Sequence, residues 1–206
     1  PCRLSMSTQK QGPQWGNRAY SWLFHSKQSW DPSTTVVEQG LYWMQQNAKT
    51  GDLFVGGDLQ RLDDFLSSDD SVISGNSARN LTTLLSQKLF SKGWTNPITN
   101  DTLSSTPALH RLWSGILGMT AYQVEIVGEL PASVSGRKHE GVEGVAAGFN
   151  GYGMWQAWLC GQAIARMALG ESKPEWLPDV YLSTEQRLTD EAHMGPDAAL
   201  TSFFLR

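Results

Sequence analysis

The sequence predicts an α+β protein in which antiparallel strands dominate, and three observations support this prediction. Short runs of aromatic and aliphatic residues recur along the first half of the chain, separated by turn-forming residues. Leucines between Leu81 and Leu89 follow the spacing of one helical face. Near the end, the glycine-rich stretch Gly144–Gly153 stands directly before an almost entirely apolar run that reaches Leu169.

The bulk composition is that of a soluble globular protein. The chain has 206 residues, 40% of them hydrophobic and 17% charged, with a net charge of −4. That length supplies one fair-sized core or one and a half small domains. Lysines and arginines are scattered, without the basic run of a nucleic-acid-binding protein, and no apolar run is long enough to span a membrane. We therefore expect a cytoplasmic protein that binds neither nucleic acid nor membrane.

The first part of the chain is predicted to form a sheet. Strands are expected at Arg3–Thr8, Tyr20–Phe24, Leu41–Gln46 and Leu53–Asp58. Asp31–Ser33 predicts a turn, and Asn47–Asp52 is a hairpin-like loop that makes its two flanking strands antiparallel. We expect the acidic segment Asp63–Asp70 to be a solvated loop.

One amphipathic helix is predicted next. The leucines that define its apolar face are Leu81, Leu84, Leu85 and Leu89. Asn76 or Ser77 is expected to cap its start, and Gly93 follows its end. Thr95–Pro107 is polar and predicts a loop.

The second part returns to strands and ends in a helix. Strands are predicted at Leu109–Thr120, Val124–Pro131 and Val142–Ala147, with a polar loop at Ala132–Glu140. A helix is predicted from Gly151 to about Leu169. We expect residues 1–108 to be mostly one antiparallel sheet with a helix, residues 109–175 to hold the strands, glycine loop and second helix, and residues 176–206 to be a tail.

The glycine loop has two interpretations. A strand that runs through glycines into a helix leaves free backbone N–H groups and partial positive charge at the helix N-terminus, where phosphate, carboxylate or carbonyl oxygen binds. Without a Cβ, glycine also lets a flat ligand lie against the backbone. The order in "GFNGYG", Gly148–Gly153, is not the dinucleotide-binding order G-x-G-x-x-G. Spacing alone favours a simple tight turn.

A resemblance to a known family adds to this. "VAAGFNGYGM" followed by "AWLCGQAIARMALGE", Val145–Glu171, resembles the C-terminal signature of FAD-dependent oxidoreductases of the D-amino-acid oxidase and glycine oxidase type. "HRLWSGILGMT…IVGELP", His110–Pro131, resembles a second segment of that family. Gly40–Asp58 is similar to the substrate-domain hairpin of fungal-type relatives, and "PCRLSM" to a family strand. The matches are collinear to about residue 175.

The resemblance implies FAD as cofactor and an amine or amino acid as substrate. Hydride would pass from a C–N bond to the flavin, and the loop would face the pyrimidine end of the ring while the helix dipole stabilises negative charge on the reduced flavin. In full-length relatives it also allows a peroxisomal location. The residues it assigns to the cofactor are Trp113, Gly115, Gly118, Gly148, Phe149, Asn150, Gly151, Tyr152, Gly153 and Met154.

The chain also departs from the family. The N-terminal Rossmann βαβ unit that would hold the FAD pyrophosphate is missing, so we expect weak FAD binding by this chain alone. The chain starts at a proline, which we interpret as a longer protein's C-terminal half, a processed product or an incomplete gene model. Leu4, Tyr122 and Glu125 replace a glycine, an aspartate and a proline. Leu117 stands where amino-acid oxidases carry the arginine that clamps the carboxylate, and Tyr152 replaces a histidine.

Catalytic residues are not assigned by the sequence. His25, Tyr42 and Arg111 are candidates, and Trp22, Tyr42 and Trp43 could form an aromatic substrate wall or belong to the core. No metal site is expected, since "HEGVE", His139–Glu143, lacks the zinc spacing.

Three functions follow as hypotheses. The first is the C-terminal part of an FAD-dependent oxidoreductase. The second is a truncated, non-catalytic remnant of that family that acts as a folded interaction module. The third is an aromatic-rich β domain that binds a small apolar or sugar ligand. The oligomeric state is not predicted, and Cys160, inside an apolar helical run, is expected to be a buried thiol.

Overall fold

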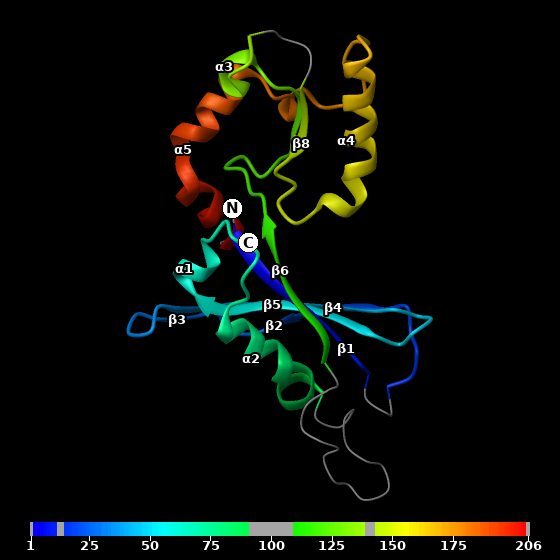
Figure 1. The fold of residues 1–206 in the computed structure, drawn as a ribbon, viewed down its shortest axis with the longest axis vertical. Helices are drawn as coiled ribbons and strands as arrows, with labels where there is room; N and C mark the ends of the chain where they lie inside the picture. The colour runs from blue at the N-terminus through cyan, green and yellow to red at the C-terminus, as the bar shows by residue number, and fades with distance from the viewer. Residues whose placement is uncertain (1, 12–14, 91–108, 139–142, 205–206) are drawn as a thin grey trace, which may run out of the picture. The chain divides into compact units, whose positions relative to one another are not determined.

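The computed structural model describes residues 2–11, 15–90, 109–138 and 143–204 (Figure 1). It is a mixed α+β protein with a mostly antiparallel sheet, as the sequence predicts. The chain divides into two compact units, which we call the N-terminal unit, Cys2–Ile116, and the C-terminal unit, Leu117–Arg206. Each unit has its own hydrophobic core.

A six-stranded sheet forms the N-terminal unit. Its strands are β1 (Cys2–Gln9), β2 (Ser21–His25), β3 (Ser29–Asp31), β4 (Val36–Gln46), β5 (Leu53–Arg61) and β6 (Leu109–Leu117). The order is β2-β4-β5-β1-β6, with β3 also paired to β4. The four predicted strands are confirmed, but β4 begins five residues before Leu41 because a bulge between Glu38 and Tyr42 lets it continue. Gly40 occupies the bulge with φ +75°.

Two helical segments follow β5. They are α1 (Leu62–Phe65) and α2 (Gly75–Thr83), and α2 continues as a π-helical turn, Leu84–Leu89. The predicted loop at Asp63–Asp70 is therefore wrong in part. Phe65 is fully buried. The carboxylate of Asp64 forms an ion pair with the buried Arg3 and accepts a hydrogen bond from its guanidinium at 2.8 Å, which anchors the segment to β1.

The predicted amphipathic helix is confirmed, and its cap is not. The N-cap residue is Ser74, and its side chain does not bond to the first turn. Ser77, one of the expected caps, is buried within the helix and bonds to Gln60 instead. Gly93 and Thr95–Pro107 lie outside the described residues.

The core of the N-terminal unit lies between α2 and one face of the sheet (Figure 1). Its buried members are Tyr42, Met44, Leu53, Val55, Leu81, Leu84 and Leu85. The ring of Tyr42 covers Gly57, where an added Cβ would lie 2.1 Å from Tyr42 Cδ1. The glycine is thus required by the packing of the aromatic ring on the strand.

The C-terminal unit has a two-stranded antiparallel sheet covered by helices. Its elements are β7 (Ile126–Glu129), α3 (Ala132–Ser135), β8 (Gly144–Ala147), α4 (Gly153–Ala168), a 3-10 turn (Asp179–Tyr181) and α5 (Glu185–Phe204), which is kinked at Gly195. Val127, Cys160, Ala163 and Leu177 form the core. Within the described residues no helix is both long and apolar enough to cross a membrane.

Three predictions differ from this unit. Residues 176–206 are not a tail, because Leu177 is in the core and Glu185–Phe204 is helical. The predicted polar loop at Ala132–Glu140 contains the single helical turn α3. The unit boundary falls after Ile116 rather than before Leu109, since β6 pairs with β1 and completes the first sheet.

Candidate functional site

The candidate site is the loop that joins β8 to α4. Gly148, Asn150 and Gly151 all have positive φ, at +68°, +52° and +88°. The positive φ of Asn150 is unusual, because this conformation costs a residue with a Cβ about 1–2 kcal/mol, although asparagine tolerates it better than most residues. Three left-handed residues in four reverse the chain sharply and turn it into the helix.

The Asn150 side chain holds this loop in place. It is 2% exposed, and its amide nitrogen donates to the Gly148 carbonyl at 2.6 Å. Its amide oxygen accepts from the Thr120 N–H at 2.8 Å, and the Asn150 N–H donates to the Gly118 carbonyl at 3.1 Å. These bonds fasten the loop to Gly118–Thr120 and use both polar atoms of the Asn150 side chain and its backbone N–H, which offsets the backbone strain.

Close packing explains two of the glycines. An added Cβ on Gly148 would lie 2.5 Å from the Thr120 methyl carbon, and one on Gly153 would lie 3.2 Å from Phe149 Cβ. For these residues the interpretation as a tight turn with close packing is sufficient.

Gly151 is different. A Cβ added there would meet no atom within 4 Å, so the space beside this glycine is open. The helix that follows starts at Gly153, two residues later than predicted, with Tyr152 at the N-cap. No side chain caps it, and its first turn contains no acidic residue. The first-turn N–H groups and the partial positive charge therefore remain available to an acceptor.

Aromatic and apolar side chains surround this helix start. The rings of Tyr152 and Trp155 lie 5.6 Å apart at 41°. Both are exposed, as is Met154. The loop thus offers open backbone on one side and aromatic surface beside it, which suits a flat, electron-rich ring.

The cofactor residues implied by the resemblance fall into two groups. Gly118 and the loop Gly148–Met154 are brought together in the C-terminal unit by the bonds of Asn150. Trp113 and Gly115 lie on β6, in the N-terminal unit. They belong to the sheet face opposite α2, because Ser114 bonds to Ser5 on the α2 side and side chains alternate along a strand.

The three aromatic residues considered as a substrate wall are separated by the pleat. Tyr42 is buried in the core, where its hydroxyl donates to Glu38 at 2.6 Å and accepts from Asn80. Trp22 packs against the same core. Trp43 points to the opposite face, where its ring covers Gly56. Other large exposed hydrophobic residues of that face include Leu23, Phe54, Leu109 and Trp113.

The remaining catalytic candidates are on the surface. His25 ends β2 and is exposed. Arg111 is exposed on β6, one residue before Leu112, which packs toward the core. Within the described part of the chain, neither His25 nor Arg111 bonds to an acidic side chain that would mark it as an acid or base.

A buried polar group that sequence reasoning missed lies behind α4. Glu125 is buried, and it lies close enough to Tyr181 and Cys160 to influence both groups. Burial first, and then Glu125, raise the pKa of the Tyr181 phenol and of the Cys160 thiol above their usual values. Cys160 is thus the buried thiol that the sequence predicts. The only signal for Glu125 was its replacement of a family proline.

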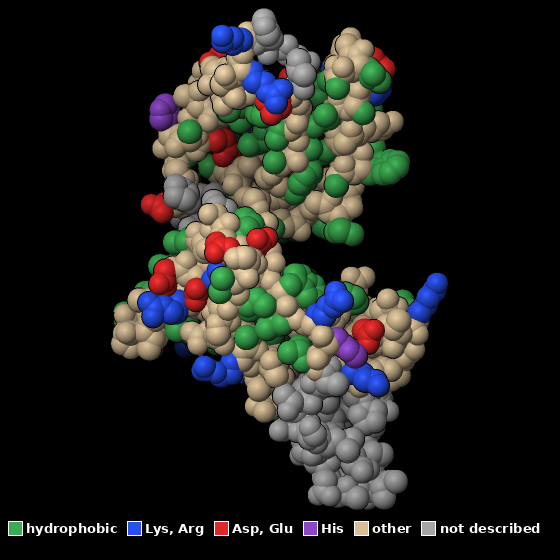
Figure 2. Space-filling view, in the orientation of Figure 1, with side chains coloured by type: hydrophobic (Ala, Val, Ile, Leu, Met, Phe, Trp, Pro, Cys, Tyr) green, Lys and Arg blue, Asp and Glu red, His purple; other side chains and the backbone are tan. Residues whose placement is uncertain are grey.

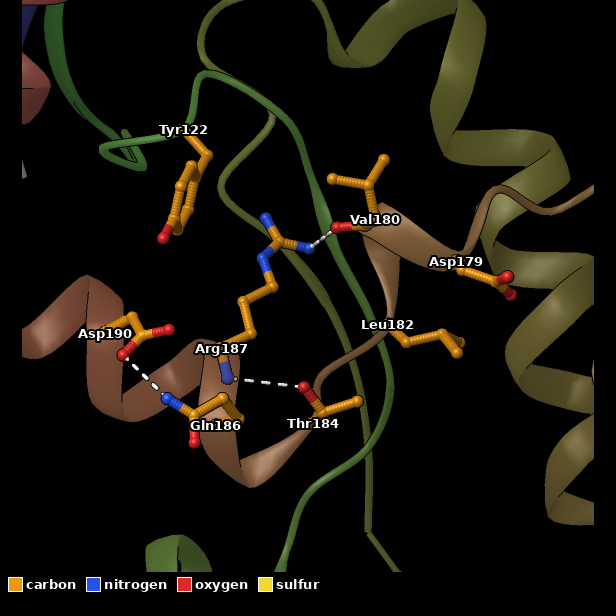
Figure 3. A pocket seen from close by; sticks show the side chains of 8 residues that line it. All are labelled: Tyr122, Asp179, Val180, Leu182, Thr184, Gln186, Arg187 and Asp190. Carbon is orange, nitrogen blue, oxygen red and sulfur yellow. Dashed lines mark hydrogen bonds between the residues drawn. The ribbon is translucent and has the colours of Figure 1, made fainter.

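A hollow of about 260 Å³ lies near the start of α5 (Figure 3). Arg187 extends along it, but its guanidinium donates to the carbonyls of Val124, Glu125 and Val180. Asp179, on its rim, pairs with Lys173 at 3.0 Å. Arg187 thus fastens α5 to the segment before β7, and Asp179 is already paired, so we assign the hollow no ligand.

Among the described residues, no group of three or more His, Cys, Asp and Glu side chains could hold a metal ion. His139–Glu143 lies mostly outside them. Comparisons of the chain with protein-family models, with curated proteins and with solved structures found no match. Its function is therefore argued from the site itself.

Proposed function

We propose that this chain is the flavin-facing part of an FAD-dependent oxidoreductase that acts on an amine or amino acid. The observation that carries the proposal is the open space beside Gly151 at the start of an uncapped sixteen-residue helix. Packing excludes a Cβ at two neighbouring glycines, whereas at Gly151 the φ of +88° favours glycine and the space beside it is open. Its lack of a side chain is what a ring lying against the backbone needs.

The residues present fit a flavin. The first-turn N–H groups of α4 would donate to a ring carbonyl, and the helix dipole would favour negative charge there. Asn150 would keep the loop rigid, so that these donors are already oriented when the ring arrives. Tyr152 and Trp155 would cover the ring edge and exclude water.

When bound, the flavin would supply the redox chemistry by accepting a hydride from the carbon that bears the nitrogen; loss of a proton from the nitrogen gives the imine, and oxygen then reoxidises the flavin and forms peroxide. The protein's part is to bind and orient the ring. We assign no catalytic side chain: Tyr42 is committed to its core hydrogen bonds, and His25 and Arg111 stay candidates for substrate contact.

The adenosine end of FAD is a separate matter. The strand pairs whose register is defined are all antiparallel, and the described residues contain no βαβ unit with a glycine fingerprint for the pyrophosphate. The proposal therefore predicts that affinity resides in the isoalloxazine ring. FAD and riboflavin should bind this chain with similar, weak affinity.

One observation favours the second hypothesis, a folded interaction module. Large apolar side chains on α4 are exposed, among them Trp158 and Leu169. Such a surface indicates a protein contact whether or not flavin binds. An interaction module would show that contact and no affinity for flavin.

Paired glycine variants test the flavin site. Gly151 and Gly170 flank α4 at its two ends, both with strongly positive φ, and an added Cβ would meet nothing at either position. Valine at either residue should cost a similar 1–2 kcal/mol or so in backbone strain. Only Gly151→Val should block the ring, and we expect it to weaken riboflavin binding about tenfold or more, measured by flavin fluorescence quenching.

Gly170→Val is the matched control, and it should bind riboflavin as the unmodified chain does. Equal riboflavin affinity in Gly151→Val and Gly170→Val, with both variants folded by circular dichroism, would contradict the proposed site.

A further inference from the structure

One side of α4 carries a stripe of apolar side chains that are exposed among the residues the structure describes. Met154 is 93% exposed, Trp155 65%, Trp158 83% and Leu169 81%. At 3.6 residues per turn they share one face of the helix, opposite the core residues Cys160 and Ala163. Figure 2 shows hydrophobic side chains projecting from α4 into solvent. We call these four residues, with the exposed small residues between them, the α4 stripe.

The α4 stripe is self-complementary in size. Its centre lies between Gly161 and Gln162, which are exposed, and an added Cβ on Gly161 would meet nothing. Residues at equal distances on either side of that centre have complementary side chains. A large side chain is matched by a small one in Trp158 with Ala165 and Trp155 with Ala168, and two long side chains are matched in Met154 with Leu169. A second α4 running antiparallel across this centre would place each tryptophan over an alanine of its partner. The glycine would let the two backbones approach closely at the crossing.

Charge follows the same two-fold pattern. The first turn of α4 has no acidic residue and no side-chain cap, whereas Glu171 lies just beyond its end. The Glu171 N–H bonds back to the Arg166 carbonyl, and the Glu171 carboxylate accepts from the Arg166 guanidinium of the same helix at 2.6 Å, so an ion pair holds Glu171 at the helix terminus. In an antiparallel pair, Glu171 of one copy would lie at the positive N-terminus of the other copy's α4. The two helix dipoles would also run antiparallel, which is a favourable arrangement. The stripe itself contains no charged side chain.

We infer that the α4 stripe is the contact surface for a second copy of this chain, as an antiparallel α4–α4 dimer. The four large side chains expose roughly 600 Å² per copy, taking about 200 Å² for each fully exposed side chain. That is a large patch for a monomer. Two copies would cover roughly 1,200 Å², at the lower end of the range for stable interfaces.

The inference goes beyond the proposed function and does not depend on flavin, so it is tested without flavin. Sedimentation equilibrium between about 1 µM and 1 mM covers the range in which such interfaces dissociate. We expect the mass to rise with concentration and to level off at twice the monomer mass. A mass that stays monomeric throughout, or that grows beyond the dimer, would overturn the inference.

Gly161→Leu tests the crossing itself. Leucine has a higher helix propensity than glycine and would meet open space here, so the monomer should fold at least as well. The added side chain would hold the two helices apart, and we expect dimer formation to be lost. Gly75→Leu is the control, because it adds the same side chain in open space at the start of α2. Dimer formation that survives Gly161→Leu would refute the proposed packing.

A covalent test locates the two-fold centre. Gln162 lies beside it, so two copies of Gln162→Cys should form an intermolecular disulfide when treated with oxidised glutathione. Cys2 and Cys160 are buried and provide no competing thiol. Gly75→Cys, exposed on the other unit, should not cross-link above background. Equal cross-linking of the two variants would show that any association is unspecific and would overturn the α4–α4 arrangement.

Discussion

Asn150 shows how one residue shapes the candidate site. It takes a left-handed conformation that favours glycine, yet its side chain supplies bonds to Gly148 and Thr120 that glycine lacks. Sequence reasoning placed Asn150 in the loop through the resemblance. Its role as the internal fastener depends on Thr120, thirty residues away, and such a pairing leaves no local pattern in the sequence.

Two substitutions at Asn150 should separate its contributions. Asn150→Ala removes the bonds and keeps the strain, and it should destabilise the C-terminal unit by about 1–3 kcal/mol. Asn150→Gly removes the bonds but relieves the strain, so it should be less destabilising by about 1 kcal/mol. Urea unfolding measures both values. Equal losses, or a greater loss in Asn150→Gly, would show that the left-handed backbone is not strained.

The half-buried phenol of Tyr181 beside the buried Glu125 predicts a pH dependence of stability. Because burial and Glu125 raise the pKa of Tyr181, the folded state keeps a phenol proton that the unfolded state loses at lower pH. The unfolded state then binds fewer protons, so the free energy of unfolding should fall as pH rises above about 10. Tyr181→Phe should reduce this slope, measured by urea unfolding at several pH values. An unchanged slope in Tyr181→Phe would contradict the assignment.

At the scale of elements, the side-chain pattern predicted the strands and helices with a strongly apolar face and missed the helices that are held by polar contacts. The strands rich in aromatic residues and the leucine face of α2 were predictable because burial demands those periods. Helix α5 was missed, since it is anchored by a buried arginine, Arg187, which donates to three backbone carbonyls. Helix α1 was missed because Arg3 and Phe65 fix an otherwise acidic segment.

Two glycines on the N-terminal sheet should respond oppositely to alanine. Gly57→Ala would force its methyl group into the Tyr42 ring and strain a φ of +151°, and it should cost about 1–3 kcal/mol. Gly115→Ala, on β6, meets nothing and should be neutral or slightly stabilising. Thermal unfolding of both variants checks this. Similar melting temperatures would show that Tyr42 can move aside at little cost.

At the scale of the whole molecule, the chain combines two units with separate cores. The strand–loop–helix order of the C-terminal unit was readable from the sequence, because glycine and apolar residues mark it directly. The unit boundary was not, because the pairing of β6 with β1 joins segments about a hundred residues apart. The exposed α4 stripe was not predictable either, since a helix whose sequence is apolar nearly all round is expected to be buried on every side.

Flavin and a second copy should compete for the same end of α4. The ring carbonyl and the partner's Glu171 both require the uncapped N–H groups of the first turn. Addition of riboflavin should therefore shift the dimer toward monomer in sedimentation experiments. A dimer that is unaffected by saturating riboflavin would mean that the two do not share this helix end.

The most direct test of the central claim is a visible absorption titration of riboflavin and FAD with the unmodified chain at equilibrium. We predict a saturable change in the flavin band, of similar affinity for the two ligands, because binding resides in the ring and the open backbone at Gly151. A flavin spectrum that stays identical to free flavin at every protein concentration would contradict the account.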